Sequence, residues 1–151
     1  MRSLCTLLAV FSITLITAST TFAQTPVDYA TAFGRAQAGD KPLVVLVTAT
    51  WCPPCQVMKK TTIPQLMQKK AFKNCHWATV DFDLENDIAM QLTEGKGVTQ
   101  LIMFEKRDGK WTRRRIAGYK DANTVEAFMA QSQQIRSAQL AENNSATQQN
   151  K

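Results

Sequence analysis

Two cysteines with the spacing Cys-x-x-Cys are the residues of this chain best suited to chemistry. They are Cys52 and Cys55 in the stretch "ATWCPPCQ", with Pro53 and Pro54 between them and Trp51 directly before. Two thiols at this spacing can form a redox couple, supply half of a metal site, or close a structural disulfide. These three interpretations place different demands on the rest of the chain.

The redox interpretation gives the two thiols unequal roles. If Cys52 caps a helix that begins at Pro53, its sulfur faces the positive end of the helix dipole, which favours the thiolate. The two prolines have no N–H to offer, but the N–H of Cys55 remains available to the Cys52 sulfur. We therefore expect Cys52 to be exposed and to act as the attacking nucleophile. Cys55, one turn inside, is expected to be shielded and to resolve the mixed disulfide.

The metal interpretation needs more ligands than the motif contains. One Cys-x-x-Cys pair supplies two of the four ligands that a structural zinc site uses. The other soft candidates are Cys75 and His76, whose side chains would point to opposite faces of a strand. We therefore predict neither a metal nor a cofactor, and we interpret Cys75 as a small buried hydrophobe. A non-catalytic binding module with a structural disulfide stays open as the alternative, and metal binding is the weakest of the three.

The N-terminal segment is typical of a secretory signal peptide. Arg2 precedes an apolar run over residues 4–18, and small residues follow up to Ala23, where we expect cleavage. The run is shorter than the ~20 apolar residues of a spanning helix, so we expect a membrane contact only if the segment stays uncleaved. Cys5 lies within it and is excluded from the redox chemistry. We predict a periplasmic or secreted protein, in a milieu where nearby thiols pair.

The elements that must position the cysteines follow the order helix, strand, helix, strand, helix, strand, strand, helix. The unbroken apolar run from Pro42 to Thr50 predicts a central strand that ends directly before the cysteine pair. The helix after the pair should break or kink near Ile63, because Pro64 cannot donate a hydrogen bond. The other strands are predicted at 75–83, 98–106 and 110–119, and the other helices at 27–40, 85–95 and 121–135. The alternation predicts an α/β fold in which helices flank a central mixed sheet of about four strands.

The composition predicts one folded domain over residues 24–136. A tail at residues 137–151, rich in Gln, Asn, Ser and Ala, is predicted to be polar and disordered. The net charge is +6, and its densest cluster is Arg113-Arg114-Arg115. No nucleic-acid motif accompanies this cluster, so we interpret it as a solvated edge strand whose charges discourage edge-to-edge pairing. We expect a monomer without a nucleic-acid partner.

Four stretches together resemble the thioredoxin fold, namely "TATWCPPCQVMKK", "WATVDFD", the hairpin "GV…LIMFEKRDGK" and "IAGYKDANTVEAFM". More narrowly, the chain is similar to the exported thioredoxin-like proteins with a Trp-Cys-Pro-Pro-Cys site, over about residues 27–135. The resemblance implies a thioredoxin-type sheet and thiol–disulfide exchange with protein dithiol or disulfide substrates. It also implies a thiol redox partner, which the sequence does not identify. Trp51 is expected to offer a flat contact surface to partner chains.

The sequence departs from the family's pattern where a buried acid is expected. Thioredoxins keep an acidic residue six positions before the first cysteine, and this chain has Leu46 there. The family's usual proton acceptor for the inner thiol is therefore missing. Glu105 and Asp81 are the two candidate replacements.

A second departure concerns the loop that faces the cysteine pair. The family has a proline there with a cis peptide bond, and its place falls on Thr99, next to Val98. A cis bond before a non-proline residue costs about 3–4 kcal/mol, so we expect a trans Val98–Thr99 bond. The hydroxyl of Thr99 can then donate to the Cys52 thiolate, which a proline cannot do. With Pro53 and Pro54, these two residues are expected to shape the site.

Overall fold

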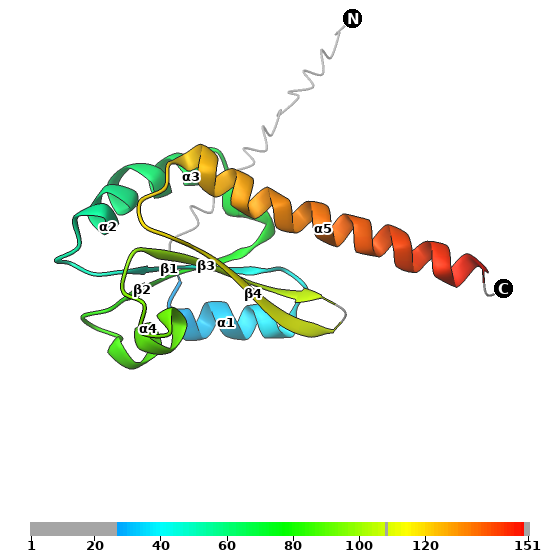
Figure 1. Cartoon of the computed structure of the whole chain (residues 1–151), viewed down its shortest axis with the longest axis horizontal. Helices are drawn as coiled ribbons and strands as arrows, with labels where there is room; N and C mark the ends of the chain where they lie inside the picture. The colour runs from blue at the N-terminus through cyan, green and yellow to red at the C-terminus, as the bar shows by residue number, and fades with distance from the viewer. Residues whose placement is uncertain (1–26, 108, 150–151) are drawn as a thin grey trace, which may run out of the picture.

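The computed structural model of the chain describes residues 27–107 and 109–149, so the predicted signal peptide lies outside the described residues. A four-stranded sheet of order β2-β1-β3-β4 lies between two layers of helices (Figure 1). The strands are β1 (Leu43–Thr48), β2 (His76–Asp81), β3 (Gln100–Arg107) and β4 (Lys110–Ala117). The helices are α1 (Tyr29–Ala38), α2 (Pro53–Val57), α3 (Ile63–Gln68), α4 (Asn86–Thr93) and α5 (Ala122–Gln149). The predicted fold class is confirmed.

The central position of β1 follows from its composition. Every residue of the sequence "LVVLVT" is buried, because both faces of the strand are covered. β1 pairs in parallel with β2 and antiparallel with β3, and β3 pairs antiparallel with β4. The C-terminal ends of β1, β2 and β4 therefore meet the N-terminal end of β3 at one end of the sheet. The segment that holds the cysteines leaves β1 at this end.

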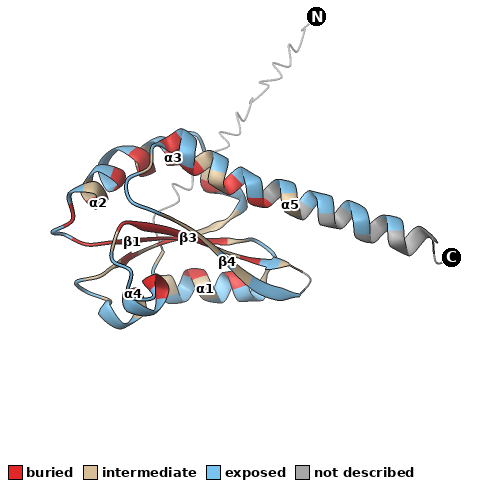
Figure 2. Ribbon diagram, in the orientation of Figure 1, coloured by how far each residue is buried: buried red, intermediate tan, exposed pale blue. Residues whose placement is uncertain are grey.

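Alternating residues of the strands build two apolar clusters, one on each face. Val44 and Leu46 belong to the cluster shared with α3 and α5, which includes Leu66 and Val125. The opposite cluster lies against α1 and α4 and contains Leu43, Val45, Val47, Ala32, Ala36, Ala89 and Leu92. Figure 2 shows the buried strands at the centre and the buried sides of the helices turned toward them. The sheet therefore gives the site a rigid support.

The helix after the cysteines changes its hydrogen-bond register without breaking. α2 continues through a π-helical segment (Met58–Thr62) directly into α3. The N–H of Ile63 donates to the carbonyl of Met58, five residues earlier. Pro64 has no N–H to extend the α-helical pattern, and the wider π turn accommodates this loss. The predicted disturbance near Ile63 is thus a change of register, and the predicted break is wrong.

The segment predicted as a disordered tail differs from that expectation. α5 continues to Gln149, with residues 137–149 in helical conformation. Ala, Gln, Glu and Leu are good helix formers, and neither glycine nor proline follows Gly118. A solvated helix and a disordered tail share a polar composition, so composition did not separate them. Figure 1 shows this part of α5 extending well beyond the sheet.

The basic cluster on β4 is engaged within the domain. Arg113 and Arg115 both form ion pairs with Glu94, the C-cap residue directly after α4. Arg114 points to the other face, where its guanidinium donates to the carbonyl of Phe128 at 2.8 Å. The edge position of β4 is as predicted, whereas the predicted solvation of the cluster is wrong for its charged groups, because the three guanidinium groups are bound to partners within the domain. A short 3₁₀ helix (Ala71–Asn74) leads into the opposite edge strand, β2.

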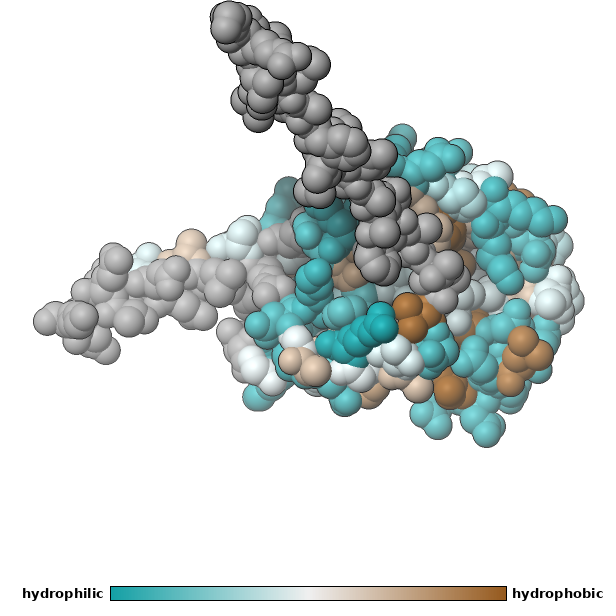
Figure 3. Space-filling model, turned by 180° about the vertical axis from the view of Figure 1, so that it is seen from behind, coloured by the Kyte–Doolittle hydropathy of each residue, from teal (hydrophilic) through white to brown (hydrophobic). Residues whose placement is uncertain are grey.

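Exposed hydrophobic side chains are few and scattered. On the face seen in Figure 3, hydrophobic residues form small separate patches on a hydrophilic surface. Among the residues whose exposure the structure describes, the large exposed ones are Trp51, Val57, Leu84, Met90, Trp111 and Tyr119. Within the part of the chain that the structure describes, no helix has the length and apolar character needed to cross a bilayer.

Candidate active site

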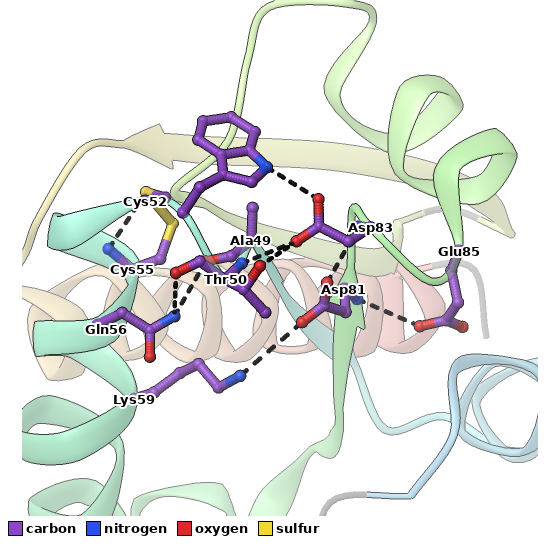
Figure 4. Close-up of polar contacts among 10 residues, drawn as sticks. Ala49, Thr50, Cys52, Cys55, Gln56, Lys59, Asp81, Asp83 and Glu85 are labelled. Carbon is purple, nitrogen blue, oxygen red and sulfur yellow. Dashed lines mark hydrogen bonds and ion pairs between the residues drawn. A yellow bond between two sulfur atoms is a disulfide. The ribbon is translucent and has the colours of Figure 1, made fainter.

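The cysteine pair lies where β1 ends and α2 begins. Cys52 and Cys55 are joined by a disulfide. Cys52 is the N-cap of α2, and its sulfur accepts the N–H of Cys55 at 3.3 Å (Figure 4). Pro53 and Pro54 occupy the first two helical positions, the former exposed and the latter half-buried. The predicted helix cap and its single backbone donor are confirmed.

The disulfide is more covered than the sequence predicts. Cys52 is 5% exposed and Cys55 is fully buried. Ala49, Phe82 and Val98 pack against the pair. The order of exposure is as expected, but Cys52 is not an exposed side chain in the disulfide form. Val98, from the loop before β3, packs against the pair, so only a small part of Cys52 is accessible to a partner.

Thr99 faces both sulfurs. All peptide bonds in the described residues are trans, which confirms the prediction for the Val98–Thr99 bond. The hydroxyl oxygen of Thr99 lies 2.9 Å from Sγ of Cys52 and 2.7 Å from Sγ of Cys55. The sequence suggested the first contact, whereas the second was missed. Thr99 has a φ of 61°, outside the extended range, and β3 accordingly begins only at Gln100.

Asp83 holds the tryptophan beside the pair, a role that the sequence analysis missed. Its carboxylate accepts the indole N–H of Trp51 at 2.8 Å, and the N–H and hydroxyl of Thr50 at 2.9 and 2.6 Å (Figure 4). These hydrogen bonds, first among them that from the Thr50 hydroxyl, lower the pKa of Asp83. Trp51 stays 64% exposed and meets Phe82 edge-on. The sequence feature that could have indicated this role is the position of Asp83 at the end of the second predicted strand, which in a parallel pair lies beside the end of the first predicted strand.

The hydrogen bond between Trp51 and Asp83 should break only at low pH. The pKa of Asp83 lies below 3.8 in the fold, so its stabilising effect is present above 3.8 and is lost as the pH falls through the lower value. The indole N–H resonance of Trp51 should therefore shift with a midpoint below 3.8. Asp83→Asn keeps an acceptor oxygen but cannot titrate, so its resonance should stay unchanged. A wild-type midpoint at or above 3.8 would contradict this assignment.

The two acids considered as proton acceptors lie in different places. Glu105 is near the end of β3 remote from the cysteines, where it forms ion pairs with Arg107 and Arg114. This position excludes Glu105 from a direct role at the pair. The position that the family gives to the acid is filled by Leu46, which is fully buried in an apolar cluster.

Asp81 lies closer to the pair. It pairs with Thr48 in the register of β1 and β2, at the end of β1 that leads to the cysteines. Its carboxylate lies 4.0 Å from the ammonium of Lys59 and accepts the N–H of Asp83 at 3.0 Å (Figure 4). These partners hold Asp81 beside the loop, and no hydrogen bond joins it to either cysteine among the described contacts.

Cys75 and His76 lie at the opposite end of the sheet. His76 begins β2 opposite Leu43, whereas the cysteine pair follows Thr48 at the other end of β1. Six residues of strand separate the two ends, which at ~3.3 Å per residue is roughly 17–20 Å. The thiol of Cys75 donates to the carbonyl of Phe72 at 3.5 Å. No group of three side chains suited to hold a metal occurs in residues 27–107 and 109–149.

Cys75 should be chemically inert in the folded protein. Cys75 is half-buried rather than buried as predicted, and this burial raises the pKa of its thiol from 9.0 to about 12, which leaves about a thousandfold less thiolate. In a variant with Cys52→Ser and Cys55→Ser, a disulfide reagent should modify Cys75 slowly until denaturant is added. The associated stabilisation is present below 9.0 and is lost as the pH rises toward 12. Equal reaction rates with and without denaturant would show that Cys75 is accessible.

Comparisons with known proteins agree with this fold. Residues 23–105 match the family model described as thioredoxin-like. Trxlp from Edwardsiella tarda EIB202 is 29% identical, with a TM-score of 0.53 over 68% of this chain and 94% of that one. A thioredoxin from Thermus thermophilus is 20% identical, with a TM-score of 0.58 over 70% and 83% of the two chains. Chloroplastic thioredoxin z is also 20% identical, with a TM-score of 0.57 over 70% and 90%.

The two thioredoxin structures that are 20% identical show a likeness of fold alone. No curated protein sequence matches the chain. Together with the family model, the disulfide at the N-terminus of α2 supports a thiol–disulfide redox function for the pair.

Proposed function

The chain belongs to the thioredoxin-like family, and from this premise we propose that it is a protein thiol–disulfide oxidoreductase. The observation that supports this proposal most directly is the geometry of the pair. Cys52 caps α2 and accepts the N–H of Cys55, so the sulfur that has to become a thiolate already faces a hydrogen-bond donor. A helix N-terminus adds a favourable dipole at the same atom.

The exchange runs in two steps. The Cys52 thiolate attacks one sulfur of a substrate disulfide and releases the other as a thiolate, which leaves a mixed disulfide. Cys55 then loses its proton and attacks Sγ of Cys52. The Cys52–Cys55 disulfide forms, the second substrate sulfur is released, and two electrons have passed to the substrate. The reverse sequence oxidises a dithiol, and the reduction potential of the pair relative to its partners decides the direction.

The partners proposed are proteins that carry dithiols or disulfides, together with a thiol redox partner that recycles the pair. The exposed indole of Trp51, held by Asp83, offers such chains a flat surface next to Cys52. We place this activity in the periplasm or outside the cell. Residues 1–23, with Arg2 before an apolar run and small residues up to Ala23, support this location.

A structural disulfide in a non-catalytic binding module is the second candidate, and the coverage of Cys52 favours it. An insulin-reduction assay with dithiothreitol separates the two. The oxidoreductase should accelerate the precipitation of reduced insulin over dithiothreitol alone, and an equal amount of the Cys52→Ser variant should not. A wild-type rate equal to that of dithiothreitol alone would reject the proposed activity and favour the binding module. Redox equilibration of the pair with glutathione gives its reduction potential, and comparison with the potentials of its partners gives the direction of exchange.

A further inference from the structure

The hydroxyl of Thr99 is the polar side-chain group nearest to both reacting sulfurs. It lies 2.9 Å from Sγ of Cys52 and 2.7 Å from Sγ of Cys55, and Thr99 is 98% buried. The sulfurs of a disulfide carry no hydrogen, so in this form the hydroxyl is the donor. A threonine hydroxyl has one hydrogen to donate and two lone pairs to accept with. It can therefore serve two sulfur partners at once.

The geometry points to Thr99 as a catalytic residue that links the two thiols of the reduced protein, an inference that rests on the proposed oxidoreductase function. After reduction, the hydroxyl accepts the S–H of Cys55 and donates its own O–H to the Cys52 thiolate. The thiolate then has two donors, the Thr99 hydroxyl and the N–H of Cys55 at 3.3 Å. Hydrogen bonds to the charged form favour that form, so Thr99 stabilises the nucleophile.

The same chain of atoms moves a proton without an outside acid or base. Cys55 passes its proton to the Thr99 oxygen while Thr99 passes its own proton to the Cys52 thiolate. The products are a Cys55 thiolate, a Cys52 thiol and an unchanged threonine. No electron is transferred in this step. The two thiols thereby share one negative charge through a single hydroxyl.

In the mixed disulfide, Cys52 has no charge to stabilise, and the hydroxyl turns to Cys55. Cys55 gives its proton to water or buffer, the O–H of Thr99 donates to the resulting Cys55 thiolate as that sulfur attacks Sγ of Cys52, and the released substrate thiolate takes up a proton from the same solvent. A buried carboxylate would otherwise assist this ionisation. Leu46 offers no such group, and neither Glu105 nor Asp81 contacts Cys55 among the described hydrogen bonds.

The backbone at Thr99 indicates that the hydroxyl is required there. A φ of 61° is rare for a β-branched residue, and glycine would adopt it freely. The conformation is held because the carbonyl of Thr99 accepts the N–H of Gly118 at 2.8 Å. An unfavourable conformation kept beside reacting atoms is typical of a functional demand. Glycine would satisfy the backbone, but it carries no hydroxyl.

Three variants test this role. Thr99→Ser keeps the hydroxyl, and Thr99→Ala differs from the serine variant by that one oxygen. Thr99→Val places a methyl group where the hydroxyl was, so that no water can take its place. Thiolate absorbance of the reduced proteins gives the first apparent pKa of the Cys52–Cys55 pair, and Cys75, with a pKa of about 12, stays silent in the relevant range. Wild type and Ser should titrate below the ~8.5 of a free cysteine, and Ala and Val about one unit higher. Should the Val variant fail to fold, the comparison of Ala with Ser decides.

Two further readouts follow the reacting sulfurs. In glutathione buffers, the equilibrium of Ala and Val should shift up to about tenfold toward the disulfide, because their reduced form loses a thiolate donor. Release of glutathione from a Cys52 mixed disulfide should need a higher pH in Ala and Val than in Ser. Identical pKa values and identical release profiles in Ser, Ala and Val would overturn the inference. These measurements use no protein substrate, so their outcome is independent of the insulin assay. The role of Thr99 can be confirmed when insulin is not reduced, and it can be overturned when insulin is reduced.

Discussion

Replacing Cys52 with serine is expected to reduce insulin reduction to the rate of dithiothreitol alone, whereas Cys55→Ser, in the absence of dithiothreitol, should stop the exchange at a trapped mixed disulfide. Cys52 is the slightly exposed sulfur and caps α2, while Cys55 is fully buried behind it. A partner therefore reaches Cys52 first, and only Cys55 is placed to attack the resulting mixed disulfide. Without Cys55, the substrate stays bound to Cys52.

The trapped species can be measured directly. A Cys55→Ser protein incubated with a disulfide-containing substrate should gain the mass of one substrate chain, and dithiothreitol should remove it. Cys75→Ser is the matched control, because it removes a thiol at the far end of the sheet and should leave both activity and trapping unchanged. Full multiple turnover by Cys55→Ser would show that the two roles are assigned incorrectly.

Replacing Leu46 with aspartate, which introduces the acid that thioredoxins keep at this position, is expected to destabilise the protein by about 3–5 kcal/mol. Leu46 is fully buried in the cluster that contains Leu66, Leu101 and Val125. No cation is hydrogen-bonded or ion-paired there among the described contacts, so a carboxylate would be buried without a partner. Because ordinary domains have a free energy of unfolding of about 5–15 kcal/mol, this loss is measurable by urea unfolding.

Leu46→Asn is the matched control for charge. Asparagine has nearly the same shape as aspartate but cannot ionise, so its cost should be independent of pH. Burial raises the pKa of the new carboxyl, so the extra cost of aspartate over asparagine should be largest at neutral pH and shrink as the pH falls. Equal costs for the two variants at neutral pH would mean that water or a cation reaches position 46.

The sequence predicts best those features that depend on neighbouring residues. The unbroken apolar run of β1 and the Cys52 cap of α2 both follow from local patterns, and the structure confirms them. The contact of Asp83 with Trp51 depends on which strand ends lie side by side, and residue spacing alone does not reveal that. The coverage of Cys52 likewise depends on a loop that contributes Val98 from elsewhere in the chain.

At Thr99, the sequence predicts the trans peptide bond but not the backbone conformation. Counting along the hairpin placed it opposite the cysteines, and the cost of a cis bond indicated a trans peptide, as observed. Its left-handed conformation and its contact with Cys55 were not predictable, since both arise from how the loop closes against Gly118. Polar composition was similarly insufficient at the C-terminal segment, where helix and disordered chain share the same residues.

The direction of α5 has a practical consequence for attaching this protein to a surface. Just before α5, the carbonyl of Lys120 accepts the hydroxyl of Thr62 from the π-helical segment, and the helix then crosses the sheet, where Ser132 contacts Met103. Its 28 residues span about 42 Å at ~1.5 Å per residue, and its far end points away from α2 (Figure 1). A solid support coupled near Gln149 would therefore orient every molecule with Cys52 toward the solution. Large disulfide-bearing proteins should reach the immobilised thiol as readily as small ones.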